Sequence, residues 1–142
     1  MRRFLLDTGP AQDFNDDRNG IRGRVQAERR QGNRIGIGTP VLGELWAGLG
    51  GSESRERNIH RLHFGLSRLI LWPYDEAAAE EFGRLFNELK RVGRPMQQVD
   101  IQIAAIALAL GHCTVVSGDS DLKAVPGLSV EDWGSEASES GT

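Results

Sequence analysis

Short apolar runs alternate with longer segments of helical spacing along most of the chain. Phe4–Leu6, Leu69–Trp72 and Cys113–Val116 have the length and composition of buried strands, and Arg34–Ile37 alternates between polar and apolar positions as a strand does. Between these runs, apolar residues recur every three or four positions, which is typical of helices. The pattern predicts an α/β fold, in which helices cover both faces of a central, mostly parallel sheet of four to five strands in three α/β/α layers.

Capping and turn residues set the expected limits of the helices. Thr39 before Pro40 is a favourable helix start, Asp75 caps a helix that runs to about Val92, and Gly111 ends the most apolar helix. The chain from Asp7 to Pro10 is predicted to be a turn, and the last strand to lie at residues 128–130. The predicted helices cover about residues 19–31, 39–49, 52–66, 75–92 and 100–110, with a short helical turn at 119–122.

The length of 142 residues predicts one domain, over residues 1–133. Residues 134–142 are rich in Ser, Glu and Gly and are predicted to form a disordered tail. No apolar run approaches the roughly 18 residues that a membrane helix needs, and no secretory signal is recognisable, so we expect a cytoplasmic protein. Cys113 is the only cysteine, which excludes an internal disulfide and predicts a small core residue rather than a nucleophile.

The net charge of −3 argues against a protein that coats nucleic acid through overall basicity. Arginines are nevertheless concentrated in three groups, which contact a phosphate backbone or simply form solvated helix faces. The groups are the six arginines from Arg18 to Arg34; Arg55, Arg57, Arg61 and Arg68; and Lys90, Arg91 and Arg94.

Four acidic residues occupy positions where a surface role is unusual. Asp7 and Asp119 each follow a buried strand, so both are expected at the carboxyl edge of the sheet. Glu44 is the only acid inside an otherwise apolar predicted helix, and Asp100 opens the most apolar helix of the chain. Each one alone has a structural explanation, as a turn residue, a helix cap or an ion-pair partner.

The coincidence of four such acids favours a metal site. Carboxylates about 4 Å apart repel one another by a few kcal/mol at an effective dielectric constant near 20, so a cluster persists only where it is neutralised. Divalent cations that prefer oxygen ligands supply that neutralisation. Mg²⁺ or Mn²⁺ suits carboxylates with no nearby histidine or thiol, whereas zinc does not.

The four segments that carry these acids follow one another in a recognisable order and spacing. They are Phe4-Leu5-Leu6-Asp7-Thr8; Thr39 to Leu45 with Gly48; Asp100 to Ala105 with the apolar run to Gly111; and Val116 to Leu122 with Val125 to Leu128, Val130 and Trp133. Together, over residues 4–133, they resemble the motifs of PIN-domain nucleases and in particular VapC-type toxins of bacterial toxin–antitoxin pairs. The sequence departs from that pattern at Gly9-Pro10, at Gln97-Gln98-Val99 and at Leu122, and none of these departures removes an acid.

The resemblance implies an endoribonuclease that hydrolyses RNA with a metal-activated water, its substrate being a tRNA, rRNA or mRNA. Asp7, Glu44, Asp100 and Asp119 would be catalytic and hold Mg²⁺ or Mn²⁺, with Asp121 as an outer fifth acid. The resemblance also implies a homodimer and inhibition by a VapB-like antitoxin. Trp46 with Leu42, Leu45 and Leu49 lines the antitoxin's groove or, as the alternative, packs in the core.

Further side chains are expected to support this site. Thr8 and Ser117 either orient Asp7 and Asp119 through hydrogen bonds or bond their own backbone as turn residues. An acidic pocket repels RNA, so nearby arginines must bind phosphate, and Arg18, Arg22 and Arg24 are the candidates.

Parts of the sequence also match three other functions. Asp7-Thr8-Gly9 matches the aspartic-protease triplet, but that class is all-β and helices are predicted here. A receiver-like phospho-acceptor module needs a lysine at the end of a late strand, whereas Lys123 lies beyond the strand and Glu44 would have no role. A non-catalytic PIN-like module that binds RNA or protein stays open, although four intact acids argue against it.

Overall fold

The computed structural model describes residues 1–51 and 53–134. In this part of the chain, five parallel strands form a sheet in the order β3-β2-β1-β4-β5. In chain order the elements are β1 (Arg3–Leu6), α1 (Thr8–Asp16), α2 (Ile21–Arg30), β2 (Arg34–Gly38), α3 (Thr39–Gly48), α4 (Arg55–Leu66), β3 (Ile70–Trp72), α5 (Glu76–Arg91), α6 (Gln98–Leu110), β4 (Cys113–Val116), α7 (Ser120–Lys123) and β5 (Ser129–Glu131).

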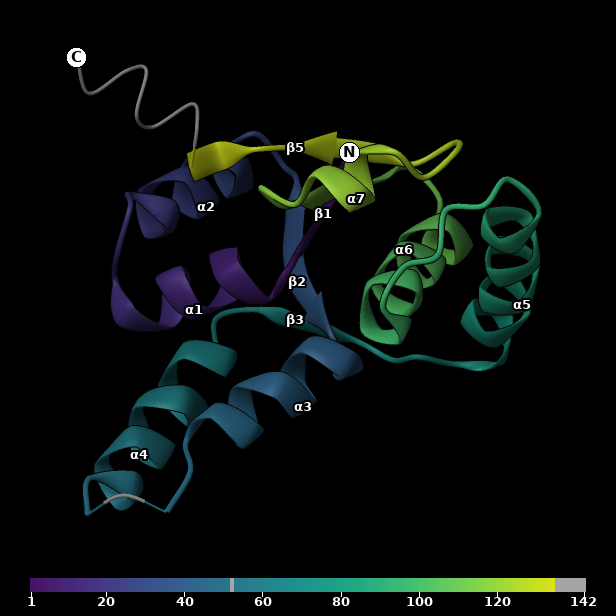
Figure 1. Cartoon of the computed structure of the whole chain (residues 1–142). Coiled ribbons are helices and arrows are strands. Elements are labelled where there is room, and N and C mark those ends of the chain that lie inside the picture. Colours follow the sequence, from purple (N-terminus) through teal and green to yellow (C-terminus); the bar gives the residue numbers. More distant parts are fainter. Residues whose placement is uncertain (52, 135–142) are drawn as a thin grey trace.

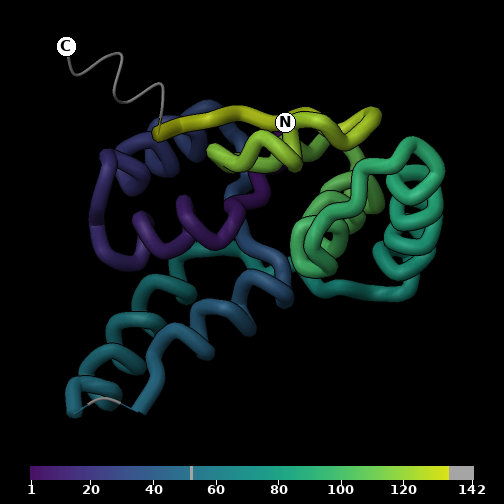
Figure 2. Tube along the Cα trace, viewed as in Figure 1, coloured from purple at the N-terminus to yellow at the C-terminus, as the bar shows by residue number. Residues whose placement is uncertain are grey.

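Helices cover both faces of this sheet. Figure 1 shows α1 and α2 on one side of the strands and α5 and α6 on the other. Helix α4 lies on the α1 side, whereas α3 starts between α1 and α6 and contacts both; the two helices project together away from the sheet, as the tube in Figure 2 also shows. They contact each other through Trp46 and His63, whose ring centroids lie 5.4 Å apart. The predicted three-layer α/β/α fold is confirmed.

Strands β1 and β4 form the middle of the sheet and end together. Leu6 pairs with Val116, and the next backbone N–H, that of Asp7, donates to the carbonyl of Val116 at 2.9 Å. Both strands are buried because helices pack on their two faces. The two acids that follow them therefore leave the sheet at the same edge.

Helix α6 is the buried helix that its composition predicts. Six of its residues are buried, all of them isoleucine or alanine, and it packs against α5 and β4. The expectation that Asp100 opens this helix is wrong, because the helix begins at Gln98 and Gln97 occupies the N-cap position. Asp100 thus lies in the first turn, and its carboxylate does not cap the helix.

The turn predicted at residues 7–10 is also wrong, since α1 begins at Thr8. Asp7 is the N-cap, with its carboxylate accepting from the backbone N–H of Thr8 at 2.8 Å. Gly9 and Pro10, which are typical turn residues, occupy the first turn of α1. A proline there loses no helical hydrogen bond, since the first amides of a helix have no carbonyl partner within it.

Two further helix ends differ from their predicted positions. Gly38, not Thr39, is the N-cap of α3, and the Thr39 hydroxyl instead accepts from the backbone N–H of Tyr74 at 3.0 Å. Helix α3 ends at Gly48, one residue before its predicted end. Ser52, the expected opening of the next helix, lies outside the described residues; α4 begins at Arg55.

Other expectations agree with the structure. Asp75 caps α5 by accepting from the backbone N–H of Ala78 at 3.0 Å, and Gly111 is the C-cap of α6. Among the described helices, none combines the length and the hydropathy that spanning a bilayer requires. The tail predicted to be disordered falls mostly on residues 135–142, which lie outside the described residues.

Candidate active site

The acids singled out from the sequence surround one place at the carboxyl edge of the sheet. Asp7 lies between β1 and α1, Asp119 precedes α7, Asp100 lies in the first turn of α6, and Glu44 lies on α3. Asp121 follows in α7 itself. Five acids from four separate parts of the chain converge here. The strands β1, β2 and β4 are parallel and end at this edge, where α3 continues directly from β2.

The pKa of Asp100 reports how closely these acids approach one another. Partial burial raises the pKa of its carboxyl most, and the charges of Asp119, Asp7, Glu44 and Asp121 raise it further, to about 6. The repulsion of the four other acids of the cluster therefore acts on Asp100.

Ser117 links the two strand ends. Its side chain is buried, and its hydroxyl donates to Oδ2 of Asp7 at 2.7 Å while accepting from the backbone N–H of Asp119 at 2.9 Å. A hydroxyl that bridges in this way fixes the Asp7 carboxylate relative to the loop after β4. Both roles expected for Ser117 are present, because its hydroxyl bonds the carboxylate of Asp7 and also bonds the local backbone at Asp119, as a turn hydroxyl does; the Asp119 carboxylate is not its partner.

Thr8 connects Asp7 to α3. Its hydroxyl donates to Oε1 of Glu44 at 2.7 Å, and its backbone N–H donates to Oδ1 of Asp7. The sequence suggested Thr8 as a partner of Asp7 and Asp119, and its hydroxyl bond to Glu44 was not foreseen. No signal in the sequence gives this contact, because it depends on the direction in which α3 leaves β2.

Asp119 and Asp121 form the less enclosed side of the cluster. Oδ1 of Asp119 caps α7 by accepting from the backbone N–H of Asp121 at 2.9 Å. Asp121 is half exposed and pairs with Arg94 at 3.5 Å. Sequence reasoning placed Arg94 in a general basic group and missed this contact. The arginine at the rim gives the acidic site one nearby cation that faces solvent.

The donor set fits a hard divalent cation bound partly through water. All five groups are carboxylates, which Mg²⁺ and Mn²⁺ accept as ligands. Within residues 1–51 and 53–134, no three acidic, histidine or cysteine side chains already surround a single point at coordinating distance. Mg²⁺ commonly keeps several of its waters and takes one or two carboxylates directly, so a ring of acids around a hydrated ion satisfies its chemistry.

The three arginines expected to bind phosphate are engaged within the protein. Arg18 pairs with Asp16 at 2.6 Å, and Arg22 donates to the carbonyls at the end of α1. Arg24 lies 4.6 Å from the ring of Trp133 and pairs with Glu131 at 3.4 Å. Their contacts serve the packing of α2, so they are weaker candidates for RNA contacts than their sequence cluster suggested.

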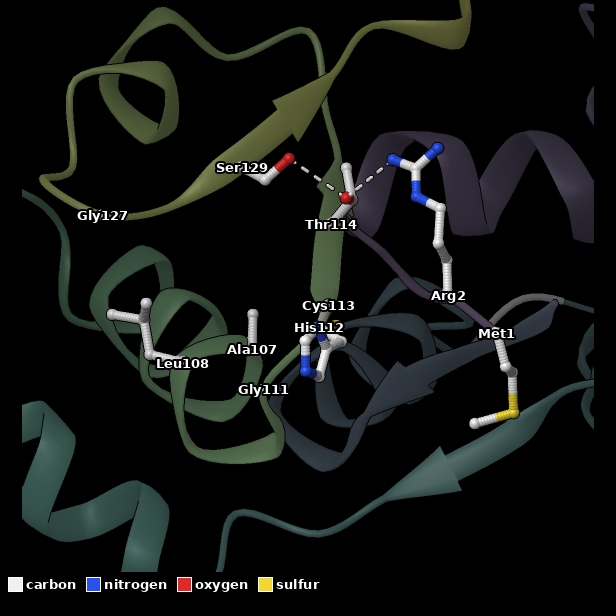
Figure 3. Close-up of a pocket in the computed structure, with 10 residues that line it drawn as sticks. All are labelled: Met1, Arg2, Ala107, Leu108, Gly111, His112, Cys113, Thr114, Gly127 and Ser129. Carbon is white, nitrogen blue, oxygen red and sulfur yellow. Dashed lines mark hydrogen bonds between the residues drawn. The ribbon is translucent and has the colours of Figure 1, made fainter.

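A cavity of about 470 Å³ lies at the opposite, amino-terminal edge of the sheet (Figure 3). Thr114 there accepts from Arg2 and shares a hydrogen bond with Ser129. Burial raises the pKa of the Cys113 thiol to about 12, so this thiol stays neutral and unreactive at ordinary pH. No acid lines this cavity, and the chemistry of the acid cluster has no counterpart in it.

Comparison with known proteins agrees with the geometry. The family model described as the PIN domain matches residues 4–128. A Shigella flexneri protein named tRNA(fMet)-specific endonuclease VapC is 33% identical over 133 residues, which span 94% of this chain and 99% of the relative. The chain belongs to the PIN-domain family and to its VapC group.

Solved structures of PIN-domain proteins show the same architecture. The crystal structure of DNA-bound VapBC from Salmonella typhimurium aligns with a TM-score of 0.83 at 32% identity, covering 94% of this chain and 99% of that one. VapBC2 from Rickettsia felis, bound to a DNA fragment from the promoter, aligns with a TM-score of 0.84 at 27% identity over 92% and 98%. The parallel sheet covered by helices also excludes the all-β aspartic-protease alternative.

Proposed function

We propose that this PIN-domain protein is a metal-dependent endoribonuclease of the VapC type, which hydrolyses RNA phosphodiester bonds and is inhibited by a cognate antitoxin. The observation that carries the proposal is the convergence of four acids on Asp100, whose pKa is raised by partial burial and then by the charges of these acids. A binding module has no need of such repulsion, whereas a site that recruits a divalent cation does. This favours catalysis over the non-catalytic and receiver-like alternatives.

Asp7, Glu44, Asp100 and Asp119 would hold Mg²⁺ or Mn²⁺, directly or through water, with Asp121 outside them. The bound cation lowers the pKa of a water and neutralises charge that develops on the phosphate. Ser117 and Thr8 restrict the rotation of Asp7 and Glu44 through their hydrogen bonds. Below about pH 6 the proton on Asp100 competes with the cation, so cation affinity falls as pH falls through that value.

The RNA class follows from the relatives. The Shigella flexneri relative carries the name of a tRNA(fMet)-specific endonuclease, which makes a tRNA the first substrate to test and rRNA or mRNA the next. The side of the cluster at Asp121 and Arg94 is exposed to solvent, which makes it the proposed side of approach for the RNA strand.

Removing the metal is expected to abolish cleavage by the purified protein. With EDTA in excess, a labelled tRNA should stay intact over hours, and added Mg²⁺ or Mn²⁺ should restore cutting, because a carboxylate cluster alone repels the phosphate. A catalytically silent metal such as Ca²⁺ serves as the matched addition. Equal cleavage with and without EDTA would contradict the proposal.

The partner is proposed from the solved relatives, which are VapBC toxin–antitoxin complexes. The groove expected around Trp46 stays a proposal. Leu45 is buried in the core, whereas Trp46, Leu42 and Leu49 are partly buried and pack against it from α3. The exposed portions of these three side chains are what an antitoxin would contact.

A homodimer is proposed on the side of α5 where Phe82 and Phe86 lie beside Met96 and Ile101. Phe82 and Phe86 stack with ring centroids 6.1 Å apart, and Phe86 is 46% exposed. An exposed aromatic side chain beside an apolar pocket marks an interaction surface. A second copy of this chain is its proposed partner.

The charges on α5 support an antiparallel arrangement of the two copies. The helix begins with an acid, Glu76, and ends with two bases, Lys90 and Arg91. A two-fold axis that crosses α5 near its middle, between Phe82 and Phe86, would set the acidic start of each copy beside the basic end of the other. The same surface is then complementary to itself.

Phe86→Glu is expected to convert the dimer to a monomer of 15.6 kDa, measured by light scattering after gel filtration. Two buried carboxylates facing each other across the axis would cost several kcal/mol. Ala109→Glu, which adds a charge at an exposed position of α6, should leave the mass unchanged. A Phe86→Glu variant of unaltered mass would place the dimer contact elsewhere.

A further inference from the structure

One face of α4 carries a stripe of arginine and phenylalanine, formed by Arg57, Arg61, Phe64 and Arg68. The spacing of four, three and four residues places these side chains in one line along the helix and just beyond its end. The stripe runs beside the buried residues Leu62 and Gly65, and its members Arg57, Arg61 and Phe64 are exposed. It is therefore largely a surface feature of α4.

The phenylalanine of the stripe is both exposed and flanked by a guanidinium. Phe64 is 63% exposed, which is unusual for so large an apolar side chain. The guanidinium of Arg68 lies 5.9 Å from the Phe64 ring and 6.0 Å from the ring of the buried Phe14. These contacts hold Arg68 in place beside an open aromatic face.

The cations around this ring are not neutralised. Among the described residues, Arg57, Arg68 and the nearby Arg29 form no ion pair, and Arg61 reaches Asp16 only at 3.6 Å. Partial burial, and then the charge of Arg68, lower the pKa of Arg29, so these two guanidinium groups repel each other. A bound anion would relieve that repulsion.

We propose that the stripe on α4 binds the single-stranded RNA substrate outside the active site, with Arg57, Arg68 and Arg29 contacting phosphates and Phe64 stacking on a base. The inference rests on the proposed ribonuclease function. Exposed aromatic rings between arginines are the features that bind single strands regardless of sequence. The stripe also supplies the phosphate contacts that Arg18, Arg22 and Arg24 cannot supply while they are engaged within the protein.

The position of the stripe suits an extended substrate. Helix α1 runs from Asp7 at the acid cluster to Asp16, which contacts Arg61 of the stripe. Nine helical residues span about 14 Å, so the two sites are separated by several nucleotides of a single strand. A short RNA would fill the active site alone, and a longer one would reach the stripe as well.

Binding is tested in the Asp7→Asn background, which should hold RNA without cutting it. Fluorescence anisotropy would measure the Kd of RNAs of about 4 and about 16 nucleotides. Phe64→Ala and the double variant Arg57→Gln/Arg68→Gln should each weaken the longer RNA about fivefold or more and leave the shorter one unchanged. The double variant should also reduce the salt slope of log K by about 1.4.

Two further variants separate stacking and charge from changes in structure. Phe64→Trp keeps an aromatic face and should retain binding, whereas Phe64→Leu keeps only apolar character and should lose it. Arg34→Gln removes an exposed arginine at the start of β2 and serves as the matched control, with the affinity of the unsubstituted stripe. All variants with Asp7 intact should cut the shorter RNA at the same kcat.

Affinities of the stripe variants for the longer RNA within about twofold of the Arg34→Gln control would overturn the proposal and leave an acidic protein partner as the occupant of the stripe. This outcome is distinct from failure of the ribonuclease function. If the unsubstituted protein cuts both RNAs but the stripe variants are indistinguishable, only the stripe is refuted. If it cuts neither RNA in Mg²⁺ or Mn²⁺, the proposed function itself fails.

Discussion

Asp100→Asn is expected to slow RNA cleavage about a thousandfold or more, equivalent to about 4 kcal/mol of activation free energy. The amide keeps the size of the side chain but removes one negative charge from the cluster. The cation therefore loses a ligand and binds more weakly to the acids that remain. Asp7→Asn should have a comparable effect. Single-turnover cleavage of a defined RNA in Mg²⁺ measures both.

Two controls accompany this comparison. Glu80→Gln removes an exposed carboxylate from α5, far from the cluster, and should cleave at the unsubstituted rate. Full cleavage by purified Asp7→Asn or Asp100→Asn would rule out the metal mechanism. Loss of cleavage in all three variants would indicate instead a general effect of lowering the negative charge.

The fold of the Asp100→Asn variant should not suffer, and the metal-free protein should become more stable. Between about pH 4 and 6 the folded protein holds a proton on Asp100 that the unfolded chain has already released, because the pKa of Asp100 is raised in the folded state. The free energy of unfolding therefore decreases as pH rises through this range, and the decrease is complete above about pH 6. Asparagine stays neutral at every pH. Allowing for solvent screening of this half-exposed group, the variant should gain about 1 kcal/mol at pH 7.5 and nothing below about pH 4.

Gly36→Ala is expected to lower the free energy of unfolding by about 3 kcal/mol. Gly36 lies in β2 between β1 and β3, and a Cβ there would approach the backbone oxygen of Ile70 to 2.2 Å. Backbone atoms cannot turn aside as a side chain does, so β3 must shift. Because β2 leads into α3, Glu44 should move with it and cleavage should fall as well.

Chemical denaturation measures the stability change. Gly23→Ala is the matched control, since a Cβ at this helical glycine of α2 meets nothing within 4 Å. It should be neutral or slightly stabilising, because alanine has the higher helix propensity. Equal midpoints for the two variants would mean that β2 and β3 are less tightly packed than the structure shows.

Much of the architecture could be predicted from the sequence because burial leaves a strong pattern. The apolar runs before Asp7 and Asp119 gave two strands that end at one edge, and the all-round apolar helix after Asp100 could only be buried. Acids set among such residues are conspicuous. Their convergence follows once the strands are taken as parallel.

The features that the sequence did not predict depend on the direction in which helices leave the sheet, and not on the spacing of apolar residues. Helix α1 was overlooked because Gly9 and Pro10 resemble a turn when the hydrogen bonds of a first helical turn are not considered. The bonds from Thr8 to Glu44 and from Arg94 to Asp121 join distant residues whose approach is set by how whole helices leave the sheet. No local spacing contains that information.

Direct measurement of Mn²⁺ binding tests most sharply whether these acids form a metal site. Isothermal titration of the purified protein at pH 7.5 should show one or two Mn²⁺ bound per chain, with Asp7→Asn and Asp100→Asn each weakening the affinity at least about tenfold and Glu80→Gln leaving it unchanged. Mn²⁺ binding that is equally tight in all four proteins, or absent from the unsubstituted one, would contradict the site at Asp7, Glu44, Asp100 and Asp119.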